Sequence, residues 1–312
     1  MSVYVVSPYR GISGGPEALH QLGHVLCESG VDARMAYIFQ GRFLLDGKHP
    51  EFFDYLVPAA EGMEDIAENT IVVPEIFTIE GVDPKTGEYL LSLKNAKIVV
   101  WWLGAYKCLG QPHILHRFKD ARHVAQSHHA RRVLEHNGVL ADMLTDYINP
   151  KLLPQETRTQ RDNKILYNPK RNIGPYLQNV GNILISKNQG YEFVAIEGFR
   201  RDELPDLFQS AKAYIDLGGQ PGMDRLPRET AIHGCCVIIG KGGATEADDM
   251  PIPERYKFEK EDVDGIVSSV EHCMNDYDSA RWDFDGYKGF VAEGQKRFTD
   301  EAKNVFGVRS TQ

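Results

Sequence analysis

The sequence predicts an α/β fold with two parallel-sheet domains, and three observations support this prediction. Short runs of β-branched residues alternate with amphipathic helical segments through almost the whole chain, a pattern typical of βαβ units. The polar segment 149–163 contains two prolines and no periodicity, which indicates a linker between domains. A second series of strands then begins, and 312 residues suffice for two domains of ordinary size.

The expected strands follow one another in two series. The first series occupies 3–7, 33–39, 70–74, 98–103, 123–126 and 144–148, and the second occupies 164–167, 191–196, 213–217 and 236–239. Residues 242–253 are expected to form a loop, and 261–276 and 290–306 to be helical. The last helix has nothing left to cover in a small second domain, so we expect it to cross back toward the first. The expected domains are therefore 1–150 and 164–290, with residues 291–312 as a helix packed on the first domain.

Composition excludes several classes of protein. The formal net charge of -9 disfavours a broad nucleic-acid-binding surface, because neutralising phosphates requires clustered Lys and Arg. No stretch approaches the roughly 20 apolar residues of a membrane span, and the run at 3–6 is too short for a signal peptide. A cytoplasmic location is therefore expected. The cysteines form no CxxC pair, so mostly buried, reduced thiols are expected rather than disulfides or a zinc site; they are Cys27, Cys108, Cys235, Cys236 and Cys273.

A glycine pair follows the first expected strand. Gly14 and Gly15 stand directly before Pro16, which suits the first turn of a helix because its missing N–H would have no partner there. Such a pair leaves backbone N–H groups accessible, and the helix dipole favours an anion such as phosphate. A tight strand-to-helix turn explains the same residues, so both interpretations stay open. Glu17, in the first turn, is explained by favourable capping alone.

The spacing of these glycines differs from the dinucleotide-binding motif. Glycines at 11, 14 and 15 do not reproduce GxGxxG, and the acidic residue expected about 20 positions later is missing. A nicotinamide-dependent oxidoreductase is therefore disfavoured.

The most informative stretch, 213–243, encodes a strand, a loop, a helix and a strand. Glycines after the first of these strands allow close backbone approach, and open α/β sheets place ligands at the carboxyl ends of their strands. Two arginines near the helix start suit a diphosphate, and a glutamate suits sugar hydroxyls. A solvated salt-bridge network is the alternative explanation. The candidate residues are Gly222, Met223, Asp224, Arg225, Arg228 and Glu229, preceded by Gly218 and Gly219 and followed by 241–243.

Two further strand ends carry candidate residues. Lys170 and Arg171 follow the strand at 164–167, where their charges can neutralise phosphate, although a solvated basic pair explains them as well. Glu197, Gly198 and Phe199 follow the strand at 191–196 and occupy the corresponding position beside it.

Together these motifs resemble those of the retaining glycosyltransferases with the GT-B architecture, the group 1 or family 4-like enzymes. Such enzymes have two Rossmann-like domains that face each other across a cleft. By this resemblance, residues 1–150 would be the acceptor-side domain and residues 164–290 the nucleotide-sugar-binding domain. Their first domain typically carries GG-x-E before a helix, which residues 14–17 match. Their second domain carries a run like EGFGLPxxEAMACGxPVI, and GMDRLPRETAIHGCCVI at 222–238 is similar to its latter half. The resemblance covers most of the chain.

The resemblance implies roles for the candidate residues, listed here in chain order. Gly14 and Gly15 would approach the donor phosphates, Lys170 and Arg171 would bind the diphosphate, Glu197 to Phe199 would border the base, and Glu229 would contact the donor ribose.

The chain also departs from the family pattern. The earlier glutamate of the Glu-x7-Glu pair falls at Pro221, so Asp224 or Gln220 is expected to substitute for it. No histidine directly follows the strand at 98–103, and no catalytic residue is assigned. The histidines that remain as candidates are His113, His116, His128 and His129.

The expected function is transfer of a hexose or pentose from a nucleotide-diphosphate sugar, with UDP favoured, to the hydroxyl of a glycan acceptor. Retention of configuration is expected, with no cofactor and no metal, since no DxD motif ends a strand. One alternative is a DNA glycosyltransferase of the bacteriophage type acting on a hydroxylated base. It would need a basic cleft, for which the candidates are Arg117, Lys119, Arg122, Arg131 and Arg132. The other alternative is a non-catalytic carbohydrate- or nucleotide-binding protein on the same fold.

Overall fold

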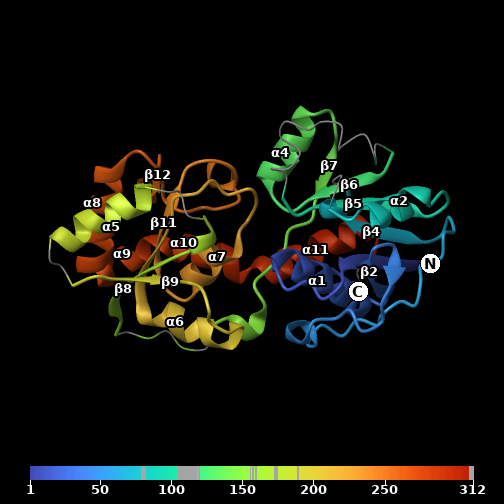
Figure 1. Ribbon diagram of the computed structural model, residues 1–312, viewed down its shortest axis with the longest axis horizontal. Helices are drawn as coiled ribbons and strands as arrows, with labels where there is room; N and C mark the ends of the chain where they lie inside the picture. Colours follow the sequence, from blue (N-terminus) through green and yellow to red (C-terminus); the bar gives the residue numbers. More distant parts are fainter. Residues whose placement is uncertain are drawn as a thin grey trace. The chain divides into compact units, whose positions relative to one another are not determined.

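The chain divides into two compact units in a computed structural model (Figure 1). Unit 1 comprises Met1–Tyr147 and Gln295–Gln312, and unit 2 comprises Ile148–Gly294. The residues that the structure describes are 1–78, 82–104, 118, 120–154, 156, 158, 160–171, 175–187 and 190–308. Each unit is built on its own sheet, so the α/β fold class expected from the sequence is confirmed.

Unit 1 contains a seven-stranded sheet in the order β3-β2-β1-β4-β5-β6-β7. All neighbouring strands are parallel except the short β2–β3 pair. The chain leaves β1 toward β2 on one side and returns to β4 on the other, so the strand order reverses between β1 and β4. The strands are β1 (Ser2–Pro8), β2 (Asp32–Phe39), β3 (Arg42–Phe43), β4 (Thr70–Pro74), β5 (Lys97–Trp102), β6 (Arg122–Ala125) and β7 (Ala141–Met143).

Alternation along the strands divides the unit 1 core between the two faces of the sheet. Val3 and Val5 belong to one buried cluster, whereas Tyr4 and Val6 belong to another, because successive strand residues point to opposite faces. The first face is covered by α1 (Gly14–Glu28) and α11 (Gly294–Phe306), and the second by α2 (Pro84–Ser92) and α4 (His128–His136). Both faces are thus buried, as parallel sheets require.

The last helix, α11, packs in unit 1. Phe298, Ala302 and Val305 follow a helical spacing and are 0%, 0% and 4% exposed in the same cluster as β1 and β5. The ring of Phe298 stacks on Trp101, with centroids 6.1 Å apart. The helix expected at 290–306 is interrupted, however, because α10 (Asp285–Ala292) ends before α11 begins and the two belong to different units.

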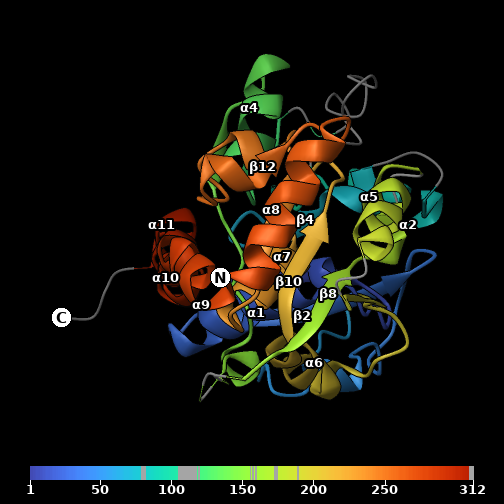
Figure 2. The same cartoon turned by 90° about the vertical axis from the view of Figure 1, so that its left-hand side faces the viewer.

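Unit 2 contains a five-stranded parallel sheet in the order β12-β11-β10-β8-β9. Its strands are β8 (Asp162–Tyr167), β9 (Glu192–Ala195), β10 (Ala211–Asp216), β11 (Cys236–Gly240) and β12 (Lys257–Phe258). Helices α5 (Pro175–Ser186) and α8 (Val263–Asn275) lie on one side of the sheet, and α6 (Leu204–Ser210) and α7 (Arg225–Ile232) on the other (Figures 1 and 2). The strand order reverses between β8 and β10.

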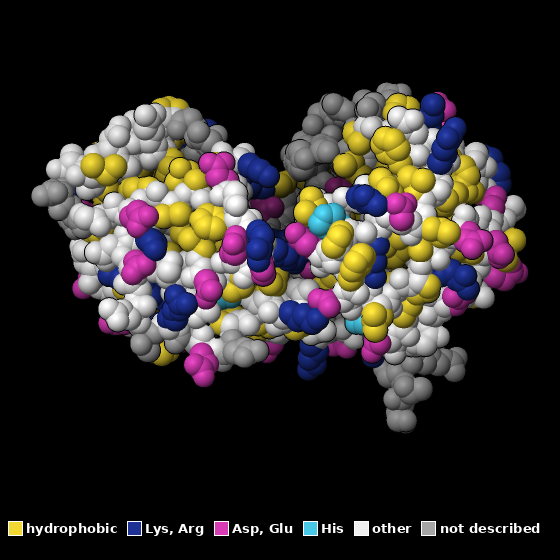
Figure 3. Space-filling view, turned by 60° about the horizontal axis from the view of Figure 1, so that its bottom comes forward, with side chains coloured by type: hydrophobic (Ala, Val, Ile, Leu, Met, Phe, Trp, Pro, Cys, Tyr) yellow, Lys and Arg dark blue, Asp and Glu magenta, His cyan; other side chains and the backbone are white. Residues whose placement is uncertain are grey.

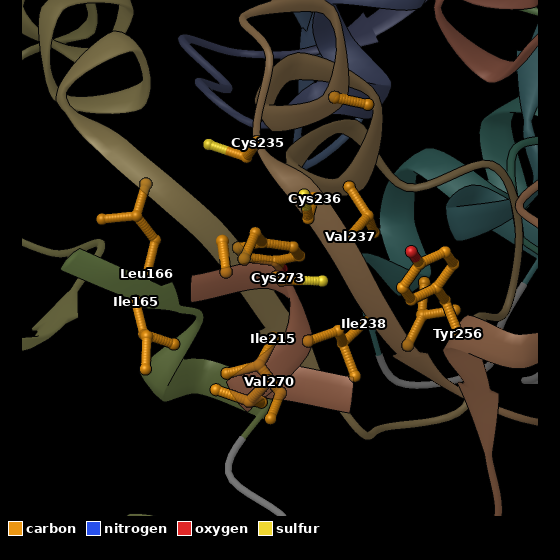
Figure 4. Packing of buried hydrophobic residues seen from close by; sticks show 14 of the residues in the cluster. Ile165, Leu166, Ile215, Cys235, Cys236, Val237, Ile238, Tyr256, Val270 and Cys273 are labelled. Atoms are coloured by element: carbon orange, nitrogen blue, oxygen red, sulfur yellow. The ribbon is translucent and has the colours of Figure 1, made fainter. Parts of the chain in front are cut away.

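Three thiols lie in the core of unit 2. Cys235, Cys236 and Cys273 are free and fully buried among aliphatic side chains such as Ile238 (Figure 4). Burial raises the pKa of the Cys235 thiol to about 12. These cysteines are inert packing residues, as their scattered spacing predicts.

Short helical turns complete the fold. They are η1 (Pro50–Phe52), η2 (Glu75–Thr78), η4 (Pro150–Leu152), η5 (Pro169–Arg171), η6 (Arg201–Glu203), η7 (Ala244–Glu246), η8 (Glu254–Tyr256), α9 (Tyr277–Ala280) and η9 (Arg281–Phe284). Within the described ranges, every helix is too short or too polar to cross a bilayer.

Two expectations about the region between the sheets are wrong. The strand expected at 144–148 is instead β7, which ends at Met143. The apolar residues at 144–148 are buried in the core but do not pair with β6 as a strand. The segment expected to be a linker ends in structure, since Asp162 and Asn163 belong to β8. Arg161 before them is 8% exposed and donates to the carbonyl oxygens of Phe208 and Ala211 at 3.0 and 2.8 Å.

Candidate functional site

Three loops meet at the carboxyl edge of the unit 2 sheet. They follow β8, β10 and β11, and the first two flank the reversal of strand order between β8 and β10. Open α/β sheets bind ligands at such a reversal, because the flanking loops diverge there and leave a crevice. The residues singled out in the second half of the sequence, from Lys170 to Glu229, come from these loops, from the loop after β9 and from α7.

Arg171 joins two of the loops. Its Nη1 donates to the carbonyl oxygen of Gly219 at 2.6 Å, and its Nη2 forms an ion pair with the Asp224 carboxylate. The Arg171 and Asp224 side chains are 23% and 32% exposed. The pair is therefore accessible at the edge of the sheet and also braces the loop after β10 against the end of β8.

The loop after β11 is paired with the loop after β10. The amide of Gln220 donates to the carbonyl oxygen of Gly242 at 3.2 Å, and the amide of Ala244 donates to that of Gln220 at 2.8 Å. Gly243 has φ of 70°, and a Cβ there would lie closer than 3.0 Å to the Gln220 carbonyl oxygen. Only glycine allows this approach, so the two loops form one platform.

A buried carboxylate lies beneath this platform. Asp216, at the end of β10, is 5% exposed and accepts hydrogen bonds from the Gly218 amide and the Tyr214 hydroxyl, both at 3.1 Å. Burial raises its pKa, and the positive charge of Arg171 and the hydrogen bonds oppose the rise. Sequence reasoning missed Asp216, although its position at the last residue of an apolar strand was a usable signal.

Asp224 is the N-cap of α7 and has a perturbed pKa. Burial raises the pKa of its carboxyl group to about 6, against the effect of Arg171 and with a further increase from the charge of Asp216. Two carboxyl groups and one guanidinium therefore share a small volume. A perturbed acid of this kind in a loop-lined crevice marks a candidate functional site.

The residues of α7 differ in their accessibility. Arg225 is half-buried in the first turn. Arg228 is 3% exposed and donates to the carbonyl oxygens of Met223 and Asp224, so it holds the loop before the helix. Glu229 is 7% exposed in the second turn. The charged side chains of α7 are therefore partly or fully buried, and they do not form the solvated salt-bridge network that was the alternative explanation of the sequence.

The remaining candidates of unit 2 are exposed. Lys170 is exposed in the turn after β8, and Glu197, Gly198 and Phe199 are exposed after β9. The Phe199 side chain is 41% exposed, and Gly198 has φ of 77°. An exposed aromatic ring beside a basic loop can stack on a planar ligand.

In unit 1, Gly14 and Gly15 begin α1 at the reversal between β1 and β4. The N-cap, Ser13, makes no side-chain hydrogen bond to the helix, so that side chain does not satisfy the first amides of α1. Gly15 also lies beside Leu103, which follows β5; a Cβ there would be 3.4 Å from the leucine. The turn thus presents backbone N–H groups at the carboxyl edge of the sheet.

Solved structures share the fold of this chain. A sucrose-phosphate synthase from Thermosynechococcus elongatus superposes with a TM-score of 0.67 at 13% identity, over 98% of each chain. The Anabaena protein HepE in complex with UDP and glucose gives 0.68 at 10% identity, over 98% of this chain and 99% of HepE. The fold is that of the GT-B glycosyltransferases.

A third solved structure, that of TarM, is similar over only part of its own length. TarM matches with a TM-score of 0.58 at 11% identity, over 78% of this chain and 56% of its own, so the chain spans about half of TarM. No family model and no curated protein matches the sequence. At such identities the likeness shows the GT-B fold alone.

Within the GT-B fold, the acidic residue of the first glycine turn is not a surface capping group. Glu17 is 1% exposed and accepts a hydrogen bond from the Tyr55 hydroxyl at 2.7 Å, because the first turn of α1 faces the segment after η1. His20, one turn later, is also 1% exposed; its two ring nitrogens contact the Pro16 carbonyl oxygen and the Tyr37 hydroxyl. Burial lowers the pKa of His20 to about 4. Sequence reasoning missed both roles.

Two of the four histidine candidates lie within the described residues. His113 and His116 lie outside the described residues. His128 and His129 begin α4, where Ser127 caps the helix by accepting from the Ala130 amide at 3.0 Å.

Three of the five residues proposed for a basic cleft lie within the described ranges, and one of them, Arg132, is exposed on α4. Arg122 begins β6 and therefore lies at the amino edge of the sheet, opposite Gly14; it pairs with Asp142 at 2.6 Å. Arg131 pairs with Glu135 at 3.3 Å on α4. Arg117 and Lys119 lie outside the described residues. Figure 3 shows basic and acidic side chains interspersed over the described part of one face of the molecule.

No metal cluster occurs among the residues whose positions are described. Within those ranges, no group of three or more His, Cys, Asp or Glu side chains could hold an ion.

Proposed function

We propose that the protein transfers a sugar from a nucleotide-diphosphate sugar to an acceptor hydroxyl, with a UDP-sugar as donor and a glycan as acceptor. The observation that carries the proposal is the meeting of Arg171, Asp224 and the start of α7 at the strand-order reversal of unit 2. The fold supports it, since HepE and TarM, which share that fold, are described in complexes with UDP.

The diphosphate would lie between the loops after β8 and β10. Arg171 provides a partly exposed guanidinium, and Lys170 adds an exposed ammonium beside it. The helix dipole at the start of α7, near Arg225, favours negative charge in the same place. Breaking the bond from the sugar to the diphosphate develops charge on the leaving phosphate, so these groups would stabilise the departing diphosphate. We infer no metal in this step, because cationic side chains and amides meet the need.

Other groups would orient the donor. Phe199 and its neighbours Glu197 and Gly198 would border the base, and Glu229 would contact the ribose. Gly14 and Gly15 of unit 1 would approach the phosphates. Asp224 would stand in for the glutamate that the chain lacks at Pro221. We infer retention of configuration from the resemblance of the two motifs to retaining enzymes.

Nucleotide binding tests the proposal directly. Isothermal calorimetry with UDP, GDP and NAD should show binding of UDP or GDP and none of NAD. Arg171→Ala should weaken UDP binding by about tenfold or more, because a charge-assisted hydrogen bond contributes about 1.5–3 kcal/mol. Arg158→Ala is the matched control, since Arg158 forms an exposed ion pair with Asp206 in the same unit. Equal affinities for the two variants would refute the assignment of the site.

Catalysis needs a separate measurement. Mass spectrometry should detect slow hydrolysis of a nucleotide sugar by the protein in the absence of acceptor. Tight UDP binding without hydrolysis or transfer, over a panel of UDP- and GDP-sugars, would instead identify a non-catalytic nucleotide-binding protein.

A further inference from the structure

The candidate site of unit 2 holds positive and negative groups in equal number around one carboxylate. Arg171 and Arg228 supply positive charges beside Asp224, and Asp216 supplies a second negative charge. All three alter the pKa of the Asp224 carboxyl group, so they lie close enough to interact with it. We call these four residues the charge cluster. With both acids ionised, the charge cluster is neutral before a ligand binds.

The groups around the charge cluster leave this balance nearly unchanged. Tyr214 on β10 and Tyr287 on α10 are fully buried, and burial raises the pKa of both hydroxyls, so both stay neutral. Arg225 and Glu229 on α7 carry opposite charges. Lys170 is exposed in the turn after β8. A diphosphate that binds here adds more negative charge than the Lys170 ammonium offsets, and an unbalanced charge in a partly buried site is costly.

Asp224 has fewer hydrogen-bond partners than the other acid of the charge cluster. Within the described part of the chain, its carboxylate accepts a single hydrogen bond, from Arg171, and it makes no capping bond to α7. Asp216 accepts from the Gly218 amide and the Tyr214 hydroxyl, which favour its ionised form. A phosphate attracted to Arg171 and to the first amides of α7 therefore competes directly with the Asp224 carboxylate.

The Asp224 carboxyl group is also close to taking up a proton. Burial raises its pKa to about 6, and the charges of Arg171 and Arg228 oppose this rise. A phosphate that engages Arg171 would remove part of that opposition and add a negative charge nearby. Both changes favour the neutral acid, so the pKa of Asp224 rises further once a diphosphate is bound.

We propose that Asp224 takes up a proton from solvent when the diphosphate binds, and then donates a hydrogen bond to a phosphate oxygen. The proton adds to the carboxylate, and no other covalent bond forms or breaks. Arg171 turns from the carboxylate to the phosphate, so Asp224 changes from a competitor of the ligand into a donor to it. Affinity for a diphosphate therefore falls as pH rises. The proposal rests on the proposed function in taking a nucleotide diphosphate as the ligand.

The pH dependence of UDP binding to the full chain tests this proposal. Between about pH 7.5 and pH 8.5, histidines are neutral and lysines are charged. The terminal phosphate of UDP, with a pKa of about 6, is already ionised there. The dissociation constant of UDP should rise about five- to tenfold over this range, because binding takes up a proton. Calorimetry in buffers that differ in enthalpy of ionisation should show uptake of about one proton for each UDP bound.

Asp224→Asn isolates the titration, since the amide keeps the size and a donor but cannot ionise. Its dissociation constant for UDP should change less than about twofold over the same range. At the upper pH the variant should bind UDP at least as tightly as the natural chain, whereas loss of a residue that only braced Arg171 would weaken binding at every pH. Asp206→Asn is the matched control and should keep the slope, because Asp206 forms an exposed ion pair with Arg158 in the same unit.

The outcomes separate this proposal from the proposed function. Binding of UDP by the natural chain without pH dependence or proton uptake would overturn proton coupling and leave the donor site intact. An unchanged slope in Asp224→Asn, or loss of the slope in Asp216→Asn alone, would overturn the assignment to Asp224. Absence of UDP binding at every pH would overturn both proposals.

Discussion

Replacing Gly243 with alanine tests whether the loops after β10 and β11 form one platform. Gly243 has φ of 70° and pairs with Gln220 in a parallel bridge. A Cβ at this position would lie closer than 3.0 Å to the Gln220 carbonyl oxygen, which is backbone and cannot rotate away. The bridge must therefore open in the variant.

The expected loss of stability has two main components. Gly243 combines φ of 70° with ψ of -129°, a backbone conformation that costs a non-glycine residue about 1–3 kcal/mol. Opening the bridge removes the hydrogen bonds from the Gln220 amide to Gly242 (3.2 Å) and from the Ala244 amide to Gln220 (2.8 Å). Each contributes about 0.5–1.5 kcal/mol. Gly243→Ala should therefore lower the free energy of unfolding by about 2–6 kcal/mol.

Urea denaturation of the full chain measures this loss, with Gly219→Ala as the matched control. Gly219 is in the partner loop, its φ is not in the left-handed region, and a Cβ there meets nothing within 4 Å. The control should stay within about 0.5 kcal/mol of the natural chain. UDP affinity should also fall in Gly243→Ala. The loop after β10, which the new side chain would displace, carries the Gly219 carbonyl oxygen to which Arg171 donates. Equal stabilities of the two alanine variants would refute the reasoning.

Other predictions concern α11 and the buried titratable groups. Phe298→Ala should lower the free energy of unfolding, measured in urea, by about 3–5 kcal/mol, as expected for a fully buried aromatic ring. Phe39→Ala is the control, because Phe39 is 54% exposed in the same unit. A loss no larger than that of the control would contradict the packing of α11. His20 has a pKa of about 4 in the folded state, below its unfolded value of 6.5. As pH drops, the unfolded state therefore takes up a proton first. The free energy of unfolding should fall by about 3 kcal/mol between pH 6.5 and pH 4. His20→Gln should flatten this dependence, and an unchanged slope would show that His20 is not buried as a neutral ring. Asp224 behaves oppositely: its folded pKa of about 6 exceeds the unfolded value, so its contribution falls as pH rises from 4 to 6. Asp224→Asn should remove that fall, measured as the difference in unfolding free energy between variant and natural chain at each pH.

Most strands were predictable because their signals are local. Runs of β-branched residues bounded by glycine and proline mark β1, β4 and β10 within a residue or two of their ends. The strand predicted at 144–148 was wrong, because an apolar run signals burial and not strand pairing. The residues after Met143 are buried, but they do not extend β7. The two-residue strands β3 and β12 carry too few residues to show any pattern.

The candidate site was predictable in part for the same reason. Glycines and charges at strand ends are visible in the sequence, and the parallel sheet brings the carboxyl ends of β8 and β10 to one edge. The sequence did not show which of these residues pair with one another. Arg171 and Asp224 are 53 residues apart, and only the adjacency of β8 and β10 makes them a pair. Burial likewise changed the roles of Glu17 and Arg228, because side-chain type does not reveal which face of a helix is covered.

The sequence by itself determined the α/β class, the two series of strands and the strand ends where polar residues gather, since these depend on neighbours along the chain. The tertiary structure alone decided which loops touch, which carboxyl groups lose water and which helix covers which sheet. Such properties arise from contacts between residues far apart in the chain, and a pKa or an ion pair depends on the distances that folding creates.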